Sequence, residues 1–342
     1  MLRSHHRRRR HLSVIIGILL VAAAPVLRLG VTPLLAQSPA VPGSTTFTSA
    51  GTVTSLFDVS AGAGEQPGQV PLNVTRTVTT VGDEAASEQE QAAGSNVAVT
   101  DSLEQTLTSD GRLIDQTQAR LAADRRTQAL VDCCGAKVAG TTFTMAGAGS
   151  PLRLPWFTPE EAYPYLDLTL MSTVEMAYLG HDTVDGADTL KFQQATAPTE
   201  LGDVPVPGEL IGEEGTVRLG RAYAVNRSLW VDPITGIVVR TSERIRQTLR
   251  DETGRDVVTL LSMTLGSTAD TEAAQLRAAR SEGRPVLWAH TYGPALCLAV
   301  GVLLLAAVII GAVMRLRERR LEEDFPDELA TFEDLRETFD EP

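Results

Sequence analysis

Two adjacent cysteines, Cys133 and Cys134, are the residues whose spacing most directly suggests chemistry. Neighbouring thiols can form a strained vicinal disulfide, bridge to another chain or stay free. A catalytic redox pair normally has two residues between its thiols, which lets a helix N-terminus lower the pKa of one of them. Because this spacing is absent and Gly135 follows, the sequence favours a disulfide that locks a turn.

Other catalytic arrangements find little support in the sequence. Beyond the N-terminal segment the histidines are His181 and His290, and neither lies in a hydrolase motif or in a zinc-ligand spacing. The sequence has no phosphate loop, dinucleotide fingerprint or calcium loop. The adjacent acids Glu160–Glu161 and Glu213–Glu214 would point to opposite faces of a strand, as solvated charges do. We therefore expect no catalytic residue, no cofactor and no metal.

A segment rich in aromatic residues and proline, residues 156–167, is the first candidate for ligand binding. Two interpretations stay open. The segment could cover the open side of a sheet, or it could form a lid that contacts a ligand. The candidate ligand-contacting residues in it are Trp156, Phe157, Tyr163 and Tyr165.

The elements that position these residues are anchored by an apolar stretch, Ala295–Met314. It has twenty residues without a charge, which is about the length that crosses the hydrocarbon core of a bilayer. Arg315, Arg317, Arg319 and Arg320 follow directly. Because basic flanks stay on the cytoplasmic side, we expect residues 315–342 inside and the large preceding region outside.

The N-terminus has the same polarity. Residues 1–11 form a basic segment, and residues 12–35 form a mostly apolar run that Arg28 interrupts. This run is either a signal peptide cut after Ala36 or a retained span in which Arg28 reaches toward the interface. We favour the retained anchor, because Leu34 is large for a cleavage site. The protein then lies in the plasma membrane with both termini cytoplasmic.

Residues 37–267 read as an extracytoplasmic β-domain. Runs of alternating, β-branched residues are bounded by clusters of Gly and Pro, and about ten strands are expected. In one run, Val70, Leu72, Val74 and Val78 share a face on which Arg76 is the single charged exception. We predict a curved antiparallel sheet or open barrel, followed by a juxtamembrane helix over residues 268–290. The expected strands include Val97–Leu107, Arg120–Leu130, Val174–Leu179, Thr189–Gln194, Thr216–Ala224, Ser228–Val231 and Val257–Leu265.

Charge sets limits on the partners. The 342 residues carry a formal net charge of −13, which argues against nucleic-acid binding. Ten acidic residues are concentrated in Glu322–Pro342. Apolar residues in this tail are spaced as in a short helix that binds a cytoplasmic partner, and a solvated disordered tail is the alternative. These apolar residues are Phe325, Leu329, Phe332, Leu335 and Phe339.

Several short motifs occur in a fixed order between the two apolar segments. They are Asp124-Arg125-Arg126-Thr127, Cys133-Cys134-Gly135, Tyr163-Pro164-Tyr165 and Ser228-Leu229-Trp230-Val231-Asp232-Pro233. In these residues the sequence resembles the PorA family of actinobacterial envelope proteins, over roughly residues 12–320. The resemblance implies a channel of the cell wall. The hairpin Trp230–Gly236 is also similar to one in LolA- and RseB-type open β-barrels, which implies a lipid in a concave sheet and adds Trp230 to the candidate ligand contacts.

Three functions follow from these patterns. The strands are rich in Thr, Arg and Gln, whereas a porin barrel carries an apolar outer band. We therefore expect first a membrane-anchored, non-enzymatic envelope protein whose β-domain binds a lipid or a cell-wall partner. The first alternative is a PorA-like pore. The second is an anchor or sensor that acts on a cytoplasmic partner through the acidic tail.

Overall fold

The computed structural model describes residues 2–57 and 72–324. The chain divides into two compact units, residues 1–35 with 286–342, and residues 36–285, and we describe each by itself. The apolar residues of the acidic tail, from Phe325 onward, lie outside the described residues.

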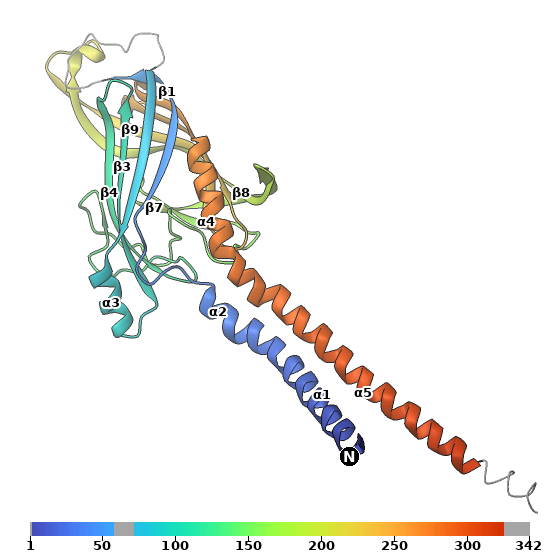
Figure 1. Ribbon diagram of the computed structural model, residues 1–342. Coiled ribbons are helices and arrows are strands. Elements are labelled where there is room, and N and C mark those ends of the chain that lie inside the picture. Colours follow the sequence, from blue (N-terminus) through green and yellow to red (C-terminus); the bar gives the residue numbers. More distant parts are fainter. Residues whose placement is uncertain (1, 58–71, 325–342) are drawn as a thin grey trace, which may run out of the picture. The chain divides into compact units, whose positions relative to one another are not determined.

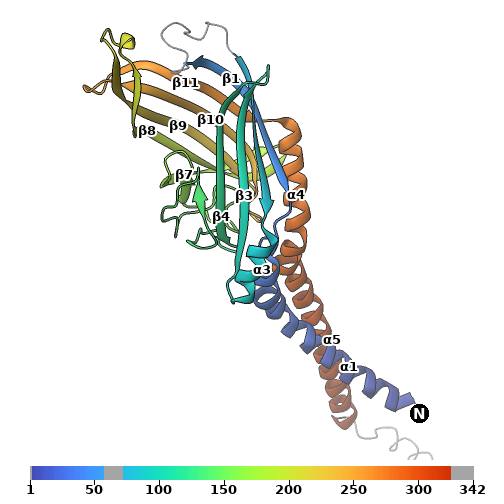
Figure 2. The same cartoon turned by 90° about the vertical axis from the view of Figure 1, so that its left-hand side faces the viewer.

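The second unit is built on one antiparallel sheet of eleven strands, in the order β5-β4-β3-β2-β1-β11-β10-β9-β8-β7-β6. Figures 1 and 2 show the long strands curving into a half-barrel. The predicted fold class is confirmed. The strands are β1 Thr45–Leu56, β2 Leu72–Gly82, β3 Val97–Thr108, β4 Leu113–Asp124, β5 Lys137–Val138, β6 Tyr163–Asp167, β7 Ser172–Val184, β8 Ala187–Pro207, β9 Thr216–Val231, β10 Val238–Arg250 and β11 Asp256–Ser267.

The structure changes three of the predicted elements. The strand expected at Arg120–Leu130 is β4, which ends at Asp124, because the Asp124 carboxylate accepts hydrogen bonds from the backbone of Arg126 and Thr127 and turns the chain. Thr216–Ala224 and Ser228–Val231 are parts of one strand, β9. The helix α3, Glu84–Ala92, was not predicted, although Asp83 caps it by accepting from the Ala86 amide.

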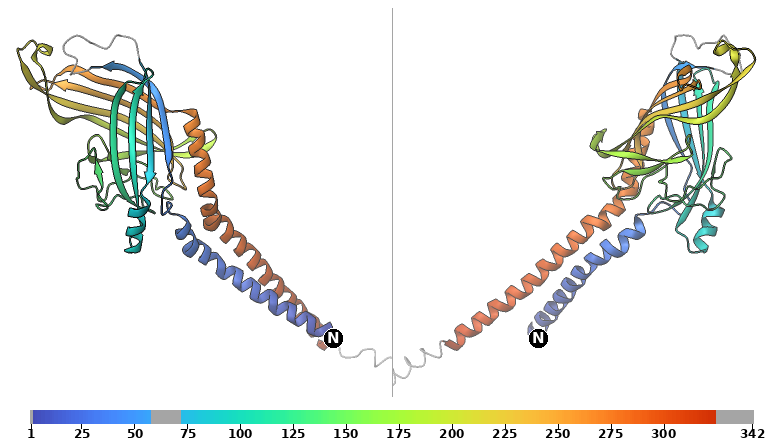
Figure 3. Two further views of the ribbon diagram at one scale, coloured as in Figure 1. Left: turned by 60° about the vertical axis from the view of Figure 1, so that its left-hand side comes forward. Right: turned by 180° about the vertical axis from the view of Figure 1, so that it is seen from behind.

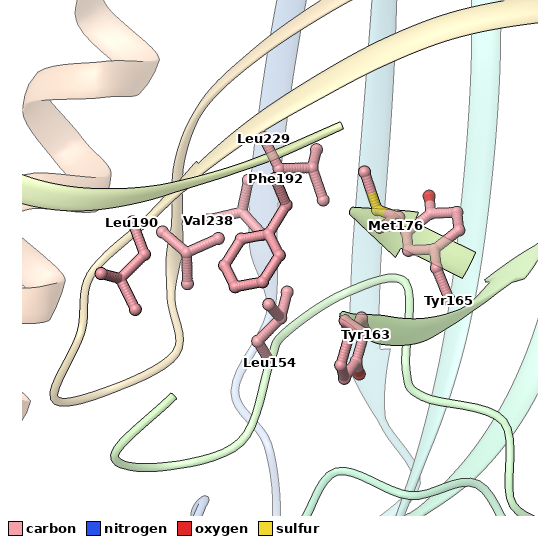
Figure 4. Close-up of a cluster of buried hydrophobic side chains, with 9 residues drawn as sticks. Leu154, Tyr163, Tyr165, Met176, Leu190, Phe192, Leu229 and Val238 are labelled. Carbon is pink, nitrogen blue, oxygen red and sulfur yellow. The ribbon is translucent and has the colours of Figure 1, made fainter. Parts of the chain in front are cut away.

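The aromatic segment covers one end of the sheet. Tyr163 and Tyr165 belong to β6 and are buried with Leu154, Met176 and Phe192. Figure 4 shows these side chains gathered between the loop around Leu154 and the strands. Burying this many large apolar side chains is the main stabilising contribution here. Both predicted roles of the segment, a cover or a lid that contacts a ligand, stay predictions.

One helix follows the last strand of the sheet. The helix α4, Ala269–Leu287, begins two residues after β11 and corresponds to the expected juxtamembrane helix. It is held at its start, where Arg240 pairs with Glu272 at 2.6 Å and the Thr48 amide donates to Thr271 Oγ1 at 3.2 Å. Figure 3 shows α4 beside the sheet in two further views.

The first unit contains the apolar segments. α1, Leu2–Pro25, continues through a π-helical turn at Val26–Val31 into α2, Thr32–Leu35. On the C-terminal side, a π-helical turn at Trp288–Tyr292 leads into α5, Gly293–Asp324. Both apolar helices are long enough to cross a membrane, and they expose many large apolar side chains, such as Leu19, Leu29 and Leu303.

α1 and α5 pack against each other within this unit through glycine. A Cβ built on Gly301 would lie 2.9 Å from the Gly17 carbonyl oxygen, and one on Gly17 would lie 2.9 Å from Leu305. Small residues at a helix crossing let two backbones approach closely, which is a common means of helix association in membranes. Figure 1 shows the two helices side by side.

The hairpin predicted around Asp232–Gly236 joins β9 to β10, and it gives a stability test. Gly236 has a φ of +71° and a built Cβ would lie 2.0 Å from the Leu154 carbonyl oxygen. Gly236→Ala should therefore cost about 2–5 kcal/mol of unfolding free energy, from backbone strain plus overpacking. Denaturant unfolding of the purified protein, followed by tryptophan fluorescence, measures this loss.

Gly186→Ala is the matched control. Gly186 has a similar φ of +76°, but a Cβ there meets nothing within 4 Å, so only the strain of about 1–2 kcal/mol remains. Equal losses for the two variants would contradict the close approach of the hairpin to Leu154.

Candidate functional site

One cavity lies inside the curve of the sheet. Its volume is about 280 Å³, and strands from both sides of the sheet line it, including Asp115 on β4 and Arg227 on β9. β4 and β9 are second and eighth in the strand order, so on a flat sheet they would be about 29 Å apart. The sheet therefore curls around the cavity.

Two further elements complete the walls. The loop that precedes β6 contributes Leu152 and Arg153, and α4 contributes Gln275, Ala278 and Glu282. The apolar part of the lining comes mainly from alternating strand positions that share the inner face. These apolar residues include Phe47, Val78, Leu229, Ile237, Val238, Ile245 and Met263.

Charged side chains lie among these apolar walls. Arg76 on β2 places Nη1 2.7 Å from Glu243 Oε2 on β10, and Nε 3.2 Å from Glu104 Oε1 on β3. Its side chain is 7% exposed. β1 and β11 lie between β2 and β10, a separation of about 14 Å on a flat sheet, so this ion pair depends on the curvature.

The network continues from Glu243. Arg227 on β9 donates from Nε to Glu243 Oε1 at 2.7 Å and from Nη1 to Gln194 Oε1 at 3.0 Å. The same nitrogen lies 3.4 Å from Asp167, whose side chain is fully buried. The Asp167 carboxylate also accepts from Gln194 and from the backbone amides that follow it. Every buried charge in this chain of contacts thus has a partner, as the cost of desolvation demands.

Burial and pairing set the protonation of these groups in opposite directions. Burial opposes ionisation of Glu243, but the nearby Arg227 and Arg76 outweigh it and lower the pKa of Glu243. Burial raises the pKa of Glu104, although Arg76 partly offsets this. Of these two carboxyls, Glu104 is therefore the one that takes up a proton first as the pH falls.

Of the five aromatic residues predicted to contact a ligand, Tyr165 lines the cavity. The Arg227 guanidinium lies 5.1 Å from the centre of its ring, a favourable cation–π distance, and burial raises the pKa of its hydroxyl. Tyr163 is in the apolar core, where its hydroxyl donates to the Ser150 carbonyl at 3.1 Å.

The other three predicted residues, Trp156, Phe157 and Trp230, are not among the residues that line the cavity. Trp156 is buried with the Arg153 guanidinium 4.6 Å from its ring centre. Phe157 follows with a φ of +53°, and its amide donates to the Ile234 carbonyl. Trp230 donates from Nε1 to Asp182 at 2.8 Å and packs near Leu276 of α4. Their contact with a ligand stays a prediction.

The vicinal cysteines form a structural turn. Cys133 and Cys134 are joined in a disulfide, and Cys134 has a φ of +60°. Arg120 holds this turn by donating from Nε to the Cys134 carbonyl at 2.8 Å, while its other nitrogens pair with Asp83 and Asp101. Among the described residues, Glu90 comes close enough to the two sulfurs for a shared metal ion, but disulfide sulfurs lack the thiolate that binds metal.

His181 lies in an exposed cluster. Its Nδ1 is 3.0 Å from Asp188 and its Nε2 is 3.4 Å from Glu160. These hydrogen bonds, with Asp188 first, raise the pKa of His181. His181 is thus an exposed residue of β7 whose ring contacts two carboxylates.

The charged network was not predicted from the sequence, although the sequence contains a pattern that indicates it. On β9 the inner face reads Tyr223, Val225, Arg227, Leu229 and Val231, in which one charge interrupts apolar residues. Arg76 interrupts β2 in the same way. A lone charge on an apolar strand face has to find a buried partner, so two such faces in one domain predict an internal ion pair.

Comparison with known proteins agrees with this architecture. A family model described as Porin PorA matches residues 11–310. The chain belongs to the PorA family. A curated relative named Porin PorA, from Corynebacterium resistens, is 26% identical over an alignment of 239 residues. The match covers 51% of this chain and 57% of that relative. The resemblance seen in the sequence is confirmed.

The family match begins within α1 at residue 11, ends within α5 at residue 310 and includes the whole half-barrel. A single family model therefore spans the helices and the sheet. The acidic tail from Glu322 lies outside the matched residues.

The network gives a second stability test. Arg227→Met removes the cation shared by two buried carboxylates, Glu243 and Asp167, so we expect a loss of about 3–5 kcal/mol of unfolding free energy. Arg218→Met on the same strand is the control. The Arg218 side chain is 67% exposed and lies 3.9 Å from Asp203, so its loss should be within about 0.5 kcal/mol. Similar losses in denaturant unfolding would mean that the network is not structural.

Proposed function

We propose that this chain is a pore-forming protein of the cell envelope that crosses the plasma membrane through α1 and α5. The family match supports this, since the curated relative carries the name of a porin. The two apolar helices supply the membrane-crossing surface.

The charges that flank the helices support the orientation. Arg7–Arg10 precede the first apolar segment and Arg315, Arg317, Arg319 and Arg320 follow the second. Basic residues stay on the cytoplasmic side. Both termini are then cytoplasmic, and the half-barrel between the helices lies outside.

The distribution of exposed apolar side chains supports a pore formed by the helices and not by the strands. On the described strands they are few, namely Val81, Leu107, Leu113 and Leu179, whereas the helical segments carry many. A membrane barrel would need an apolar band on its outer strand faces. Since two helices enclose no lumen, the pore requires helices from several copies.

Planar-bilayer recording of the purified full chain tests this proposal. Discrete conductance steps are expected. Gly301→Leu should change their size, because a side chain at residue 301 meets the Gly17 carbonyl and separates α1 from α5. Gly30→Leu is the control, since a Cβ there meets only Val26, 4.0 Å away. Absence of steps from inserted protein would refute the proposal. Steps that Gly301→Leu leaves unchanged would refute conduction through the helices, because the α1–α5 crossing would then not shape the conducting path.

The cavity favours a second function, the binding of a small amphiphilic molecule in the half-barrel. The volume of 280 Å³ is close to the lower end of ligand pockets, about 300–1,000 Å³. It suits a single apolar chain better than a lipid with two chains. Apolar walls with a few fixed polar groups are the usual composition of such a site.

Binding of a fluorescent single-chain fatty acid probe tests this second function, together with native mass spectrometry of gently purified protein. Ala278→Trp places an indole in the cavity wall, and we expect affinity to fall at least about tenfold. Ala274→Trp, on the exposed face of the same helix, should bind as the unmodified protein does. No bound molecule and no probe binding, or equal binding by both variants, would refute it.

A further inference from the structure

We infer that the ligand of the cavity carries an anionic head on a single apolar chain, and that Arg153 binds that head. The inference rests on the second function proposed above, and it adds the chemical class and the orientation of the ligand.

Arg153 is held on three sides. Nε donates to the Thr235 carbonyl at 2.8 Å, Nη1 lies 2.9 Å from the Glu282 carboxylate, and the guanidinium lies 4.6 Å from the centre of the Trp156 ring. The side chain is 14% exposed. A guanidinium fixed in this way loses little further conformational entropy when it binds an anion.

The remaining nitrogen, Nη2, is buried and has no hydrogen-bond partner. Arg153 also lines the cavity. Among the described residues that line it, this is the one guanidinium nitrogen that is buried without a partner. A buried donor left without a partner costs about 1–3 kcal/mol, and more when it is charged. A ligand oxygen that accepts from Nη2 recovers this free energy.

The charge balance at Arg153 differs from that at the other cavity arginines. Arg76 pairs with Glu104 and Glu243, and Arg227 pairs with Glu243 and Asp167. Arg153 has one ion-pair partner, Glu282, whose side chain is 36% exposed. Burial lowers the pKa of Arg153, although Glu282 partly offsets this. A second anion therefore stabilises the charged form of Arg153, as pairs of anions do for the other two.

The apolar residues beside Arg153 indicate where the apolar chain of the ligand lies. Leu152 precedes Arg153 in the sequence, and Ile237 pairs with Arg153 across an isolated bridge. Leu152, Ile237 and Val238, the residue after Ile237, all line the cavity. A head at Arg153 thus enters between apolar walls that take up its chain. A carboxylate and a phosphate monoester both offer the required anionic oxygen.

Three probes with the same twelve-carbon chain test the inference: laurate, dodecyl phosphate and uncharged methyl laurate. Their binding to the full chain in lipid nanodiscs is measured and corrected with empty discs. We expect both anions to bind the protein at least about tenfold more tightly than the ester, since one charged hydrogen bond is worth that much. The tighter of the two anions identifies the head.

Two variants act in opposite directions. Arg153→Gln should reduce anion affinity about tenfold, and Glu282→Gln should increase it, because Nη1 is then released from its carboxylate. Neither variant should change the affinity for methyl laurate. Unchanged binding of this ester would also show that the cavity of the variant is folded. Arg218→Gln, at the exposed start of β9, is the charge-matched control and should change nothing.

The outcomes separate this inference from the function on which it rests. If methyl laurate binds as tightly as laurate, or if Glu282→Gln weakens anion binding, Arg153 does not bind the head and the cavity function stands. If none of the three probes binds the unmodified protein, the cavity function itself fails.

Discussion

The pairing of β1 with β11 is the interaction on which the half-barrel depends. Every other pair of neighbouring strands in the sheet is consecutive in the sequence, so among the named strands of the described residues this is the pairing that joins the meander β1–β5 to the meander β6–β11. It runs from Ser49 opposite Ser267 to Leu56 opposite Leu261. At Gly51 a Cβ would lie 1.8 Å from the Thr264 carbonyl oxygen, so a side chain there would separate the two meanders.

The charged network lies across the same join. Arg76 comes from the first meander, while Glu243 and Arg227 come from the second. Ion pairs in a protein interior contribute less stability than their distances suggest, because desolvation offsets most of the attraction. Their geometry is demanding, however, and it is met only when the sheet has one particular curvature. The network therefore selects that curvature, and with it the width of the cavity.

The architecture was readable from the sequence because its signals are local. Alternating β-branched runs gave the strands, and twenty uncharged residues gave the second apolar helix. The cap at Asp83 was overlooked because α3 has no apolar stripe, and β4 was misplaced because its end depends on one carboxylate, Asp124. The cavity was beyond reach for another reason. Its residues come from strands paired in an order that no local pattern specifies, and most of the conspicuous aromatic residues at 156–165 do not line the cavity.

The β1–β11 pairing also has a consequence for how the domain forms. Ser49 and Ser267 are register partners, although most of the sheet lies between them in the sequence. The sequence separation of these contacts is therefore large. Such long-range pairing closes slowly, because the entropy of a long loop is lost before the contact forms. Until β11 emerges, the first meander presents β1 as an unpaired edge, the kind of edge at which strands of different molecules associate. We therefore expect association between incompletely synthesised copies to occur at β1.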